Sequence, residues 1–281
     1  MTYLKILLYA LATFMATSTL VFADDDDDDD GGIEIPFEEA GLFFELNDTD
    51  NDLGLHGKID GDEWKKMEIE DPRGRCMLKV RVQGRLKRQG LAELFFESAE
   101  PTFGELDPID FFKRFPEGIY EIEGVTLDGE ERENEVFLSH VIPAAPAGVR
   151  VNGVAAADGC DTPLSDVSPG GGIIISWDAV TRSHTDLGND RNMLLVGLGF
   201  EVRYYQVVVE IDDTNFVTTA IIPPGVNEWT FPAEFFELAK DREYKFEILV
   251  RVNNGQTDSE DKPIPGNLSA VESCFEIIEP S

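Results

Sequence analysis

The sequence predicts an all-β protein built from two successive β modules, and three observations lead to this fold class. Apolar residues alternate with polar ones over short segments, as they do in half-buried strands. Turn-forming residues separate these segments, and one short stretch, residues 108–115, has the pattern of a helix. A segment rich in proline and small residues, 141–148, divides the chain into an expected N-terminal mostly-β domain, 33–142, and a β-sandwich, 143–279.

The chain of 281 residues combines enough apolar side chains for these cores with a strongly negative charge. Hydrophobic residues make up 42% of it, so wholesale disorder is excluded. Asp and Glu number 56 against 23 Lys and Arg, a formal net charge of −33. Because phosphate contacts need clustered basic residues, this charge argues against a nucleic-acid partner and against an anionic membrane surface.

Residues 1–23 have the pattern of a signal peptide. Lys5 precedes an apolar run that ends at Ala23, and no acidic residue interrupts it. Interleaved Ala, Thr and Ser lower the hydrophobicity of the run, which favours cleavage after Ala23 over an uncleaved membrane anchor. We therefore expect a secreted protein, extracellular or periplasmic, with no membrane span after signal cleavage and with access to an oxidising environment.

Seven consecutive aspartates, 24–30, begin the expected mature chain. No apolar side chain occurs in residues 24–32. A segment with this charge and nothing to bury is predicted to be a disordered, solvated tail.

Two hairpins are predicted in the N-terminal domain. Residues 71–74 place proline second and glycine fourth, as a type I turn prefers. The Asp-Gly dipeptide at 128–129 tolerates the positive φ angles of a tight hairpin turn. The strands expected on either side of these turns cover residues 64–70, 77–82, 120–127 and 130–141.

Short alternating segments after residue 148 predict the sandwich. No long helix interrupts them, and their spacing is typical of two packed antiparallel sheets. The expected strands cover residues 173–177, 201–210, 227–231, 244–252 and 268–278.

The predicted strands at 173–177 and 201–210 contain Trp177 and Tyr204. With these residues the C-terminal module resembles a fibronectin type III domain, in which Trp177 matches the core tryptophan and Tyr204 matches its partner in the facing sheet. Leu238 and Tyr244, six positions apart, match the tyrosine corner, in which the phenol bonds back to the main chain. The resemblance implies that these four side chains belong to the structural core.

The N-terminal module is similar to the leader domain of exported proteins described only as fibronectin type III domain-containing. Residues 43–50 and 90–101 carry this likeness, which implies export and pairing with the second module and brings no activity. Residues 181–200 form an insertion relative to the family. This loop is therefore a candidate recognition surface, with a neutral insertion as the alternative.

Five aspartates form the densest acidic cluster outside the tail. Alternate carboxylates on a loop can converge on one Ca²⁺ ion. The pattern departs from an EF-hand, which needs glycine where Leu53 stands and glutamate where Ile59 stands. A turn whose side chains bond nearby main-chain N–H groups is the alternative. The candidate calcium ligands are Asp48, Asp50, Asp52, Asp60 and Asp62.

The three cysteines divide into a candidate pair and a single thiol. In a fibronectin-like topology Cys160 and Cys274 fall at the same pole of the sandwich, so they could form a disulfide or remain unpaired. Cys76 is expected to be a buried free thiol, with intermolecular pairing as the alternative.

No motif in the sequence points to catalysis. The three histidines, His56, His140 and His184, form no metal-spaced pair, and neither a nucleophile elbow nor a phosphate loop occurs. The sequence thus predicts a secreted, non-enzymatic binding, adhesion or matrix protein with an unknown protein or glycan partner. A calcium-dependent structural protein and an accessory module for polysaccharide degradation are the alternatives, and calcium is the one cofactor considered.

Overall fold

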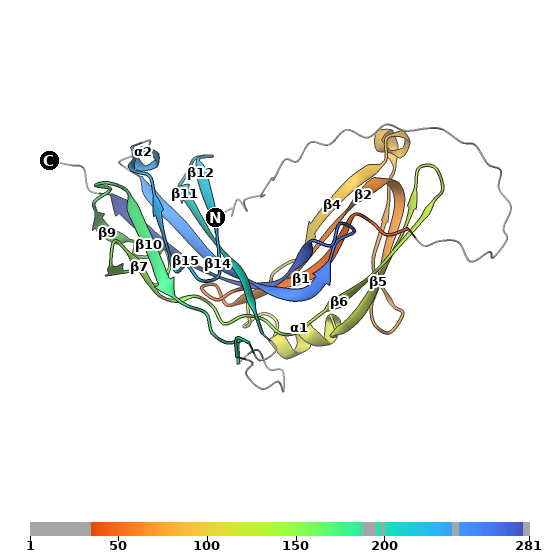
Figure 1. The fold of residues 1–281 in the computed structure, drawn as a ribbon, viewed down its shortest axis with the longest axis horizontal. Helices are drawn as coiled ribbons and strands as arrows, with labels where there is room; N and C mark the ends of the chain where they lie inside the picture. The colour runs from red at the N-terminus through yellow and green to blue at the C-terminus, as the bar shows by residue number, and fades with distance from the viewer. Residues whose placement is uncertain (1–34, 186, 188–194, 198–199, 238–241, 278–281) are drawn as a thin grey trace. The chain divides into compact units, whose positions relative to one another are not determined.

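The computed structural model of the chain has an all-β sandwich fold, as the sequence predicts (Figure 1). The predicted signal peptide and tail, together with Leu238 of the expected tyrosine corner, lie outside the described residues. No helix within the described part of the chain is long and apolar enough to span a membrane. The structure describes residues 35–185, 187, 195–197, 200–237 and 242–277.

The larger of two sheets has the strand order β12-β11-β14-β15-β1-β2-β5-β6. Three further strands join it from the side: β3 and β4 pair with β2, and β9 pairs with β15. The strands are β1 (Glu39–Asn47), β2 (Asp52–Glu70), β3 (Cys76–Arg81), β4 (Leu91–Glu97), β5 (Gly118–Thr126), β6 (Glu131–Leu138), β9 (Leu164–Val167), β11 (Val202–Ile211), β12 (Val217–Ile222), β14 (Glu243–Thr257) and β15 (Pro263–Ile277).

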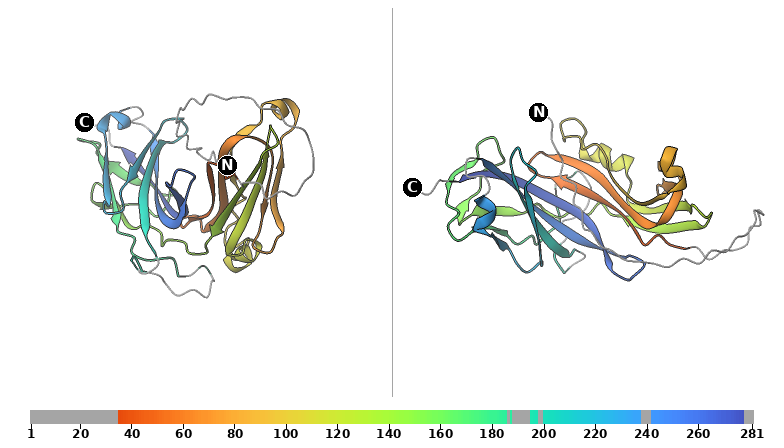
Figure 2. Two further views of the ribbon diagram at one scale, coloured as in Figure 1. Left: turned by 45° about the vertical axis from the view of Figure 1, so that its right-hand side comes forward. Right: turned by 90° about the horizontal axis from the view of Figure 1, so that it is seen from above.

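The smaller sheet has the order β13-β10-β7-β8. It packs against β11, β12, β14 and β15 to make the sandwich, and Figure 2 shows these layers from two other sides. Its strands are β7 (Ala147–Val151), β8 (Val154–Ala155), β10 (Ile173–Asp178) and β13 (Glu228–Phe231), and the helices are a 3-10 turn (Gly84–Arg88), α1 (Pro108–Arg114) and α2 (Ala233–Phe236).

The sandwich core is built around Trp177 on β10. Its ring lies 5.2 Å from that of Tyr205 on β11, and both side chains are buried. The predicted core residue Tyr204 is therefore wrong by one position, because a register shift between Val202 and Tyr204 turns the following residue inward. Tyr244 is fully buried, and its hydroxyl donates to the Phe236 carbonyl oxygen at 3.0 Å, which closes the corner at α2.

The N-terminal half is organised by the long strand β2, which pairs with β1 and β4 along its first part and with β3 and β5 along its second. Helix α1 covers this core with Phe111 and Phe112. Asp107 caps the helix by accepting from the Ile109 N–H at 2.8 Å, and Pro108 suits its first turn. The short helix expected at 108–115 is thus confirmed.

A parallel pairing between β1 and β15 joins the two halves of the larger sheet, with Glu45 opposite Leu268. Asn267 reinforces the join: its Oδ1 accepts from the Phe44 N–H, and its amide nitrogen donates to the Ser139 and Val141 carbonyl oxygens, each at 2.8 Å. Both predicted domains therefore contribute to one sheet, and a boundary near residue 143 stays a prediction.

Cys76 is exposed at the start of β3, so the expected burial of this thiol is wrong. Within the described residues β3 pairs with β2 alone, which leaves its first residue at the margin of the sheet. The hairpin before it is as expected: Gly74 has a φ of +66° and donates its N–H to the Asp71 carbonyl oxygen at 2.8 Å.

Candidate functional site

The five predicted calcium ligands do not converge. Asp48 and Asp50 lie in the turn between β1 and β2, and Asp52 begins β2. Asp60 and Asp62 follow on the same strand, where eight residues of extended chain span roughly 26 Å. Asp62 instead accepts from the Arg132 guanidinium at 2.5 Å. The structure thus separates Asp48, Asp50 and Asp52 from Asp60 and Asp62, and calcium stays a prediction for the turn alone.

That turn is closed by its own side chains. Asn47 Oδ1 accepts from the Thr49 and Asp50 N–H groups at 3.1 and 3.3 Å, the arrangement of an Asx turn. The Thr49 hydroxyl oxygen accepts from the Glu272 N–H at 2.8 Å, which ties the turn to β15. His184 lies near its outer side, with Nε2 3.7 Å from Asp48 Oδ1.

Cys160 and Cys274 form a disulfide in the structure, with their Cα atoms 4.8 Å apart and 114 positions between them in the sequence. The bond holds the segment that leads into β9 against β15, and the parallel pairing of Leu164 with Phe275 continues the contact. It therefore closes the same pole of the sandwich that the resemblance indicates.

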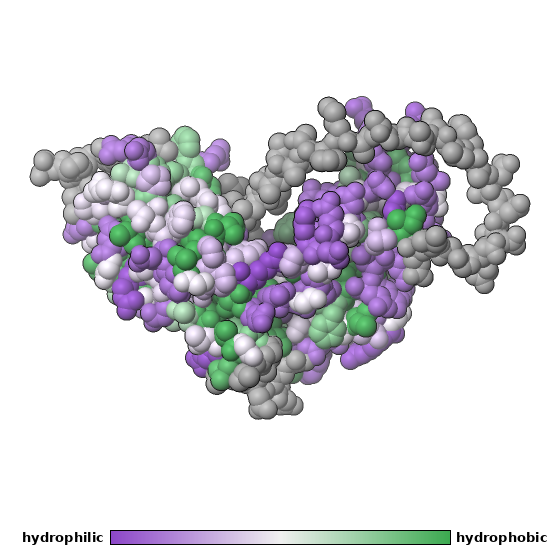
Figure 3. All heavy atoms as spheres, viewed as in Figure 1, coloured by the Kyte–Doolittle hydropathy of each residue, from purple (hydrophilic) through white to green (hydrophobic). Residues whose placement is uncertain are grey.

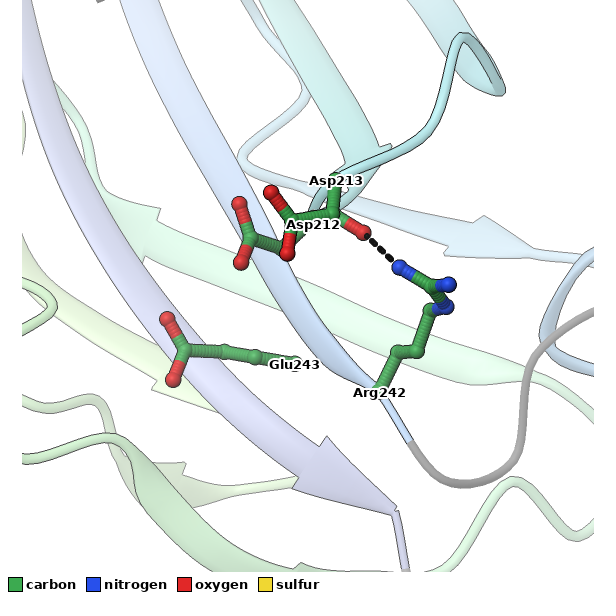
Figure 4. A pocket seen from close by; sticks show the side chains of 4 residues that line it. All are labelled: Asp212, Asp213, Arg242 and Glu243. Carbon is green, nitrogen blue, oxygen red and sulfur yellow. Dashed lines mark hydrogen bonds between the residues drawn. The ribbon is translucent and has the colours of Figure 1, made fainter. Parts of the chain in front are cut away.

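The pocket in Figure 4 lies next to this pole, with a volume of about 530 Å³ and a lining of Asp212, Asp213, Arg242 and Glu243. Arg242 Nη1 donates to the Asp212 main-chain oxygen at 3.0 Å. Burial raises the pKa of Glu243, and the neighbouring carboxylates Asp212 and Glu276 raise it further. The pocket offers three carboxylates and one guanidinium, which suit ion pairing.

The predicted recognition loop, residues 181–200, falls partly outside the described residues. Ser183 and Leu187 are buried, and Leu187 packs into the N-terminal core, whereas Leu195 and Val196 are 43% and 48% exposed. The His184 N–H donates to the Ile142 carbonyl oxygen at 2.8 Å. The first described residues of the insertion therefore pack within the molecule, and a recognition surface at the exposed Leu195 and Val196 stays a prediction.

Strand β12 and the segment after it form an apolar surface that the sequence analysis missed. Phe216 and Ile221 are 55% and 58% exposed, and Trp229 on β13 is 42% exposed. β12 and β13 stand at the ends of their respective sheets in the described structure, so each has an edge without a paired strand. We call Phe216, Val217, Ile221, Val226 and Trp229 the edge surface.

A signal for the edge surface was present in the composition. Residues 214–227 contain no charged side chain, although 28% of the chain is charged. Figure 3 shows one face of the molecule, on which apolar patches interrupt the hydrophilic side chains. An uncharged run of this length in so acidic a chain, with exposed apolar side chains, is typical of an interaction surface.

A second missed group lies on β1, β2 and β4: Glu45, His56, Glu97 and Glu100, here called the histidine–glutamate cluster. His56 Nε2 lies 3.1 Å from Glu100 Oε1 and 3.5 Å from Glu45 Oε2. Cross-strand register brings these residues together, because His56 stands opposite Glu97 on β4. Sequence spacing does not reveal it, since the members lie on different strands.

Comparison with known proteins gives no family. No family model matches the sequence, and no curated protein matches it. Similar solved structures include the FN1-FN3 domains of chicken CNTN1, at 11% identity over 86% of this chain and 65% of that one, with a TM-score of 0.31. A cytokine receptor complex matches at 12% identity over 82% and 94%, with a TM-score of 0.25.

The BSP domain of a biofilm-associated protein is also similar, at 11% identity over 86% of this chain and 30% of that one, with a TM-score of 0.22. The chain thus spans about two thirds or less of the length of two of these three structures. At such low scores the comparisons carry no argument about function, and the fold class rests on the strands of the chain itself.

Proposed function

We propose that the protein is an exported, non-enzymatic binding protein of the adhesion or matrix type, and that the edge surface contacts its partner. The sandwich acts as the scaffold, and β12 and β13 present the apolar side chains. The observation that carries the proposal is the edge of β12, which has no paired strand within the described residues, exposes apolar side chains and contains no charged residue.

Natural proteins protect the edges of their sheets with lysine, proline, bulges or covering segments, because an open edge pairs with other chains. Strand β12 has none of the first three devices within residues 217–222, and its pairing with β11 is regular from Tyr205–Ile222 to Glu210–Val217. Such an edge accepts an added strand, in which main-chain hydrogen bonds provide affinity and side chains provide specificity.

The two faces of β12 have different roles. Ile222 is fully buried opposite Tyr205 and anchors the strand to the core. Ile221 and Val217 alternate to the other face and remain exposed. A partner can therefore contact β12 without disturbing the core, and the acidic residues nearby, such as Glu210 and Glu228, favour a partner with basic side chains around an apolar centre.

The test is a binding screen of the protein against extracellular proteins and glycans, followed by two matched variants. Ile221→Lys places a charge on the edge surface, and Ile174→Lys places one on β10, where the original side chain is 41% exposed. We expect Ile221→Lys to weaken binding about tenfold or more, as loss of a central interface contact does, and Ile174→Lys to leave it unchanged.

A partner that binds both variants equally would contradict the use of the edge surface. Hydrolysis of a glycan by the purified protein, abolished by a single carboxylate substitution, would contradict the non-enzymatic role. Retention on an insoluble polysaccharide that Ile221→Lys abolishes would favour the accessory role in polysaccharide degradation.

A further inference from the structure

The histidine–glutamate cluster lies on one face of the sheet, where β1, β2 and β4 run side by side. Phe43 stands opposite His56, and Glu45 stands opposite Gly54. Since alternate residues share a face, Glu45 lies on the same side as Phe43 and His56. Glu97 stands opposite His56 from the other neighbour, and Glu100 follows three positions later.

The polar atoms of the cluster are spaced as metal ligands are. The distances from His56 Nε2 to Glu100 Oε1 and Glu45 Oε2 are 3.1 and 3.5 Å. One ligand atom each from His56, Glu97 and Glu100 lies within 4.8 Å of the other two. Bonds of about 2.1 Å from a tetrahedral Zn²⁺ ion to nitrogen and oxygen give ligand separations of about 3.4 Å.

The imidazole is held in place before any ligand arrives. His56 is 4% exposed, and Phe43 stacks on its ring with the centroids 5.2 Å apart and the planes inclined by 20°. The Phe95 ring lies on another side, with its centroid 6.0 Å from that of the imidazole. Packing on two sides fixes the direction of Nε2, and a fixed ring orientation increases the affinity of a histidine for a metal.

Gly54 makes room for the carboxylate that comes nearest the imidazole. A Cβ atom at position 54 would lie 2.6 Å from Glu100 Cγ and 2.6 Å from Glu100 Oε1. The Glu100 side chain therefore lies over Gly54, in a space that any other residue would fill. This packing allows the carboxylate to approach His56 across the strand.

Charged groups of both signs lie at the cluster. Carboxylate oxygens of Glu100 and Glu45 lie within 3.5 Å of His56 Nε2, and the Arg251 guanidinium lies over the Phe43 ring at 4.3 Å from its centroid. Burial raises the pKa of Glu45; His56 and Arg251 act against this shift, and Glu100 adds to it. A divalent cation at this place would interact favourably with the carboxylates.

We propose that His56, Glu97 and Glu100 bind one divalent transition-metal ion, with Zn²⁺ as the representative, and that the ion ties β2 to β4 and to the segment that follows β4. Glu45 lies beside the imidazole, with its Oε2 3.5 Å from His56 Nε2. An imidazole nitrogen suits Zn²⁺ better than Ca²⁺, which prefers oxygen ligands alone. The site is separate from the aspartates of the β1–β2 turn and from the edge surface.

The experiment is a titration of the metal-free full chain with Zn²⁺ by calorimetry and with Co²⁺ by visible absorption. We expect a saturable component of one ion per chain that excess Ca²⁺ does not displace, and a higher unfolding temperature with the ion bound. The variant His56→Gln should lose this component, because its affinity for the ion should be lower by a factor of about 100 or more.

Two controls separate this site from other carboxylates and imidazoles. Glu93→Gln changes an exposed carboxylate on the same strand as Glu97, and His184→Gln removes an imidazole beside Asp48. Both should retain the component. Its absence from the unaltered protein, or its persistence in His56→Gln, would overturn the proposal.

Should His56→Gln fail to fold, two milder changes decide the matter. Glu97→Gln alters an exposed side chain, and Gly54→Ala fills the space under Glu100. We expect each to lower the affinity about tenfold or more. Unchanged affinity in both would also overturn the proposal.

Discussion

The C-terminal sandwich and the N-terminal half close their cores in different ways. In the sandwich, residues from two separate sheets meet, as Trp177 on β10 and Tyr205 on β11 do. In the N-terminal half the 19-residue strand β2 serves two sets of partners in turn, and α1 supplies Phe111 and Phe112. The first arrangement has a local motif that sequence reveals, whereas the second depends on pairings that no short segment encodes.

The parallel pairing of β1 with β15 makes the two cores parts of one sheet. It leads us to expect a single cooperative unfolding transition in place of two.

Truncating the central tryptophan of either half should lower the stability of both. Trp64 is fully buried in the N-terminal core and Trp177 is 3% exposed in the sandwich. We expect Trp64→Ala and Trp177→Ala each to cost about 3–5 kcal/mol of unfolding free energy. Urea unfolding followed by fluorescence and by circular dichroism measures this. Two transitions, of which each variant shifts only one, would show that the halves unfold separately.

Removing the disulfide should destabilise the sandwich directly. Cys160 and Cys274 are 114 positions apart, so their bond closes a long loop in the unfolded chain. The double variant Cys160→Ser, Cys274→Ser should lose about 2–5 kcal/mol, measured by urea unfolding. Cys76→Ser is the control, because this exposed thiol forms no disulfide within the described residues, and it should change stability little. Equal losses in both variants would contradict a role for the bond.

Two tyrosines offer the same test in each half. The Tyr120 hydroxyl donates to the Pro116 carbonyl oxygen, and the Tyr244 hydroxyl donates to that of Phe236, each at 3.0 Å. Both rings are fully buried. We expect Tyr120→Phe and Tyr244→Phe each to cost about 1–2 kcal/mol, because the variant leaves a carbonyl oxygen without its donor. No change for Tyr244→Phe would show that the corner is held by packing alone.

Mild acid should act with opposite signs on His140 in the N-terminal half and on Glu210 and Glu243 in the sandwich. Burial lowers the pKa of His140, and a hydrogen bond to the Phe115 carbonyl oxygen only partly offsets this shift. As the pH falls, His140 is therefore protonated in the unfolded chain at a higher pH than in the folded protein. Its contribution is complete above the ordinary pKa of about 6.5 and falls as the pH decreases through the lower, folded value. In the sandwich, burial raises the pKa of Glu210 and Glu243, and protonation there favours the folded state.

We expect His140→Gln to lose less stability than the unaltered protein between about pH 7.5 and 5.5, and Glu210→Gln to lose more. Unfolding free energies at both pH values, compared between the three proteins, provide the measurement. Identical pH dependence in His140→Gln and the unaltered protein would contradict the buried, neutral imidazole.

The sequence predicted the features that local chemistry determines. The turn at residues 71–74, the helix capped by Asp107 and the strand that contains Trp177 all depend on residues a few positions apart. The inward-facing tyrosine of β11 was misplaced by one position. A bulge shifts by one residue which side chains face the core, and nothing in the composition of the strand reveals it.

The candidate sites were less accessible to sequence reasoning. The aspartate spacing suggested one loop, but Asp60 and Asp62 belong to a strand that carries them away from the turn. Conversely, His56 meets Glu45 and Glu100 through strand register, which a list of sequence spacings does not contain. Strand β12 was missed because its alternation is weak and its uncharged composition resembles that of a loop.

The hydrogen bond from the Phe44 N–H to Asn267 Oδ1 connects residues 223 positions apart. During synthesis from the N-terminus, one edge of β1 therefore lacks its neighbour until β15 has been made and the sheet can close. Contacts of such separation fold slowly, since the intervening chain must be ordered first. The last strand thus completes the first half of the molecule, and a chain shortened before β15 would keep the edge of β1 open to pairing with other chains.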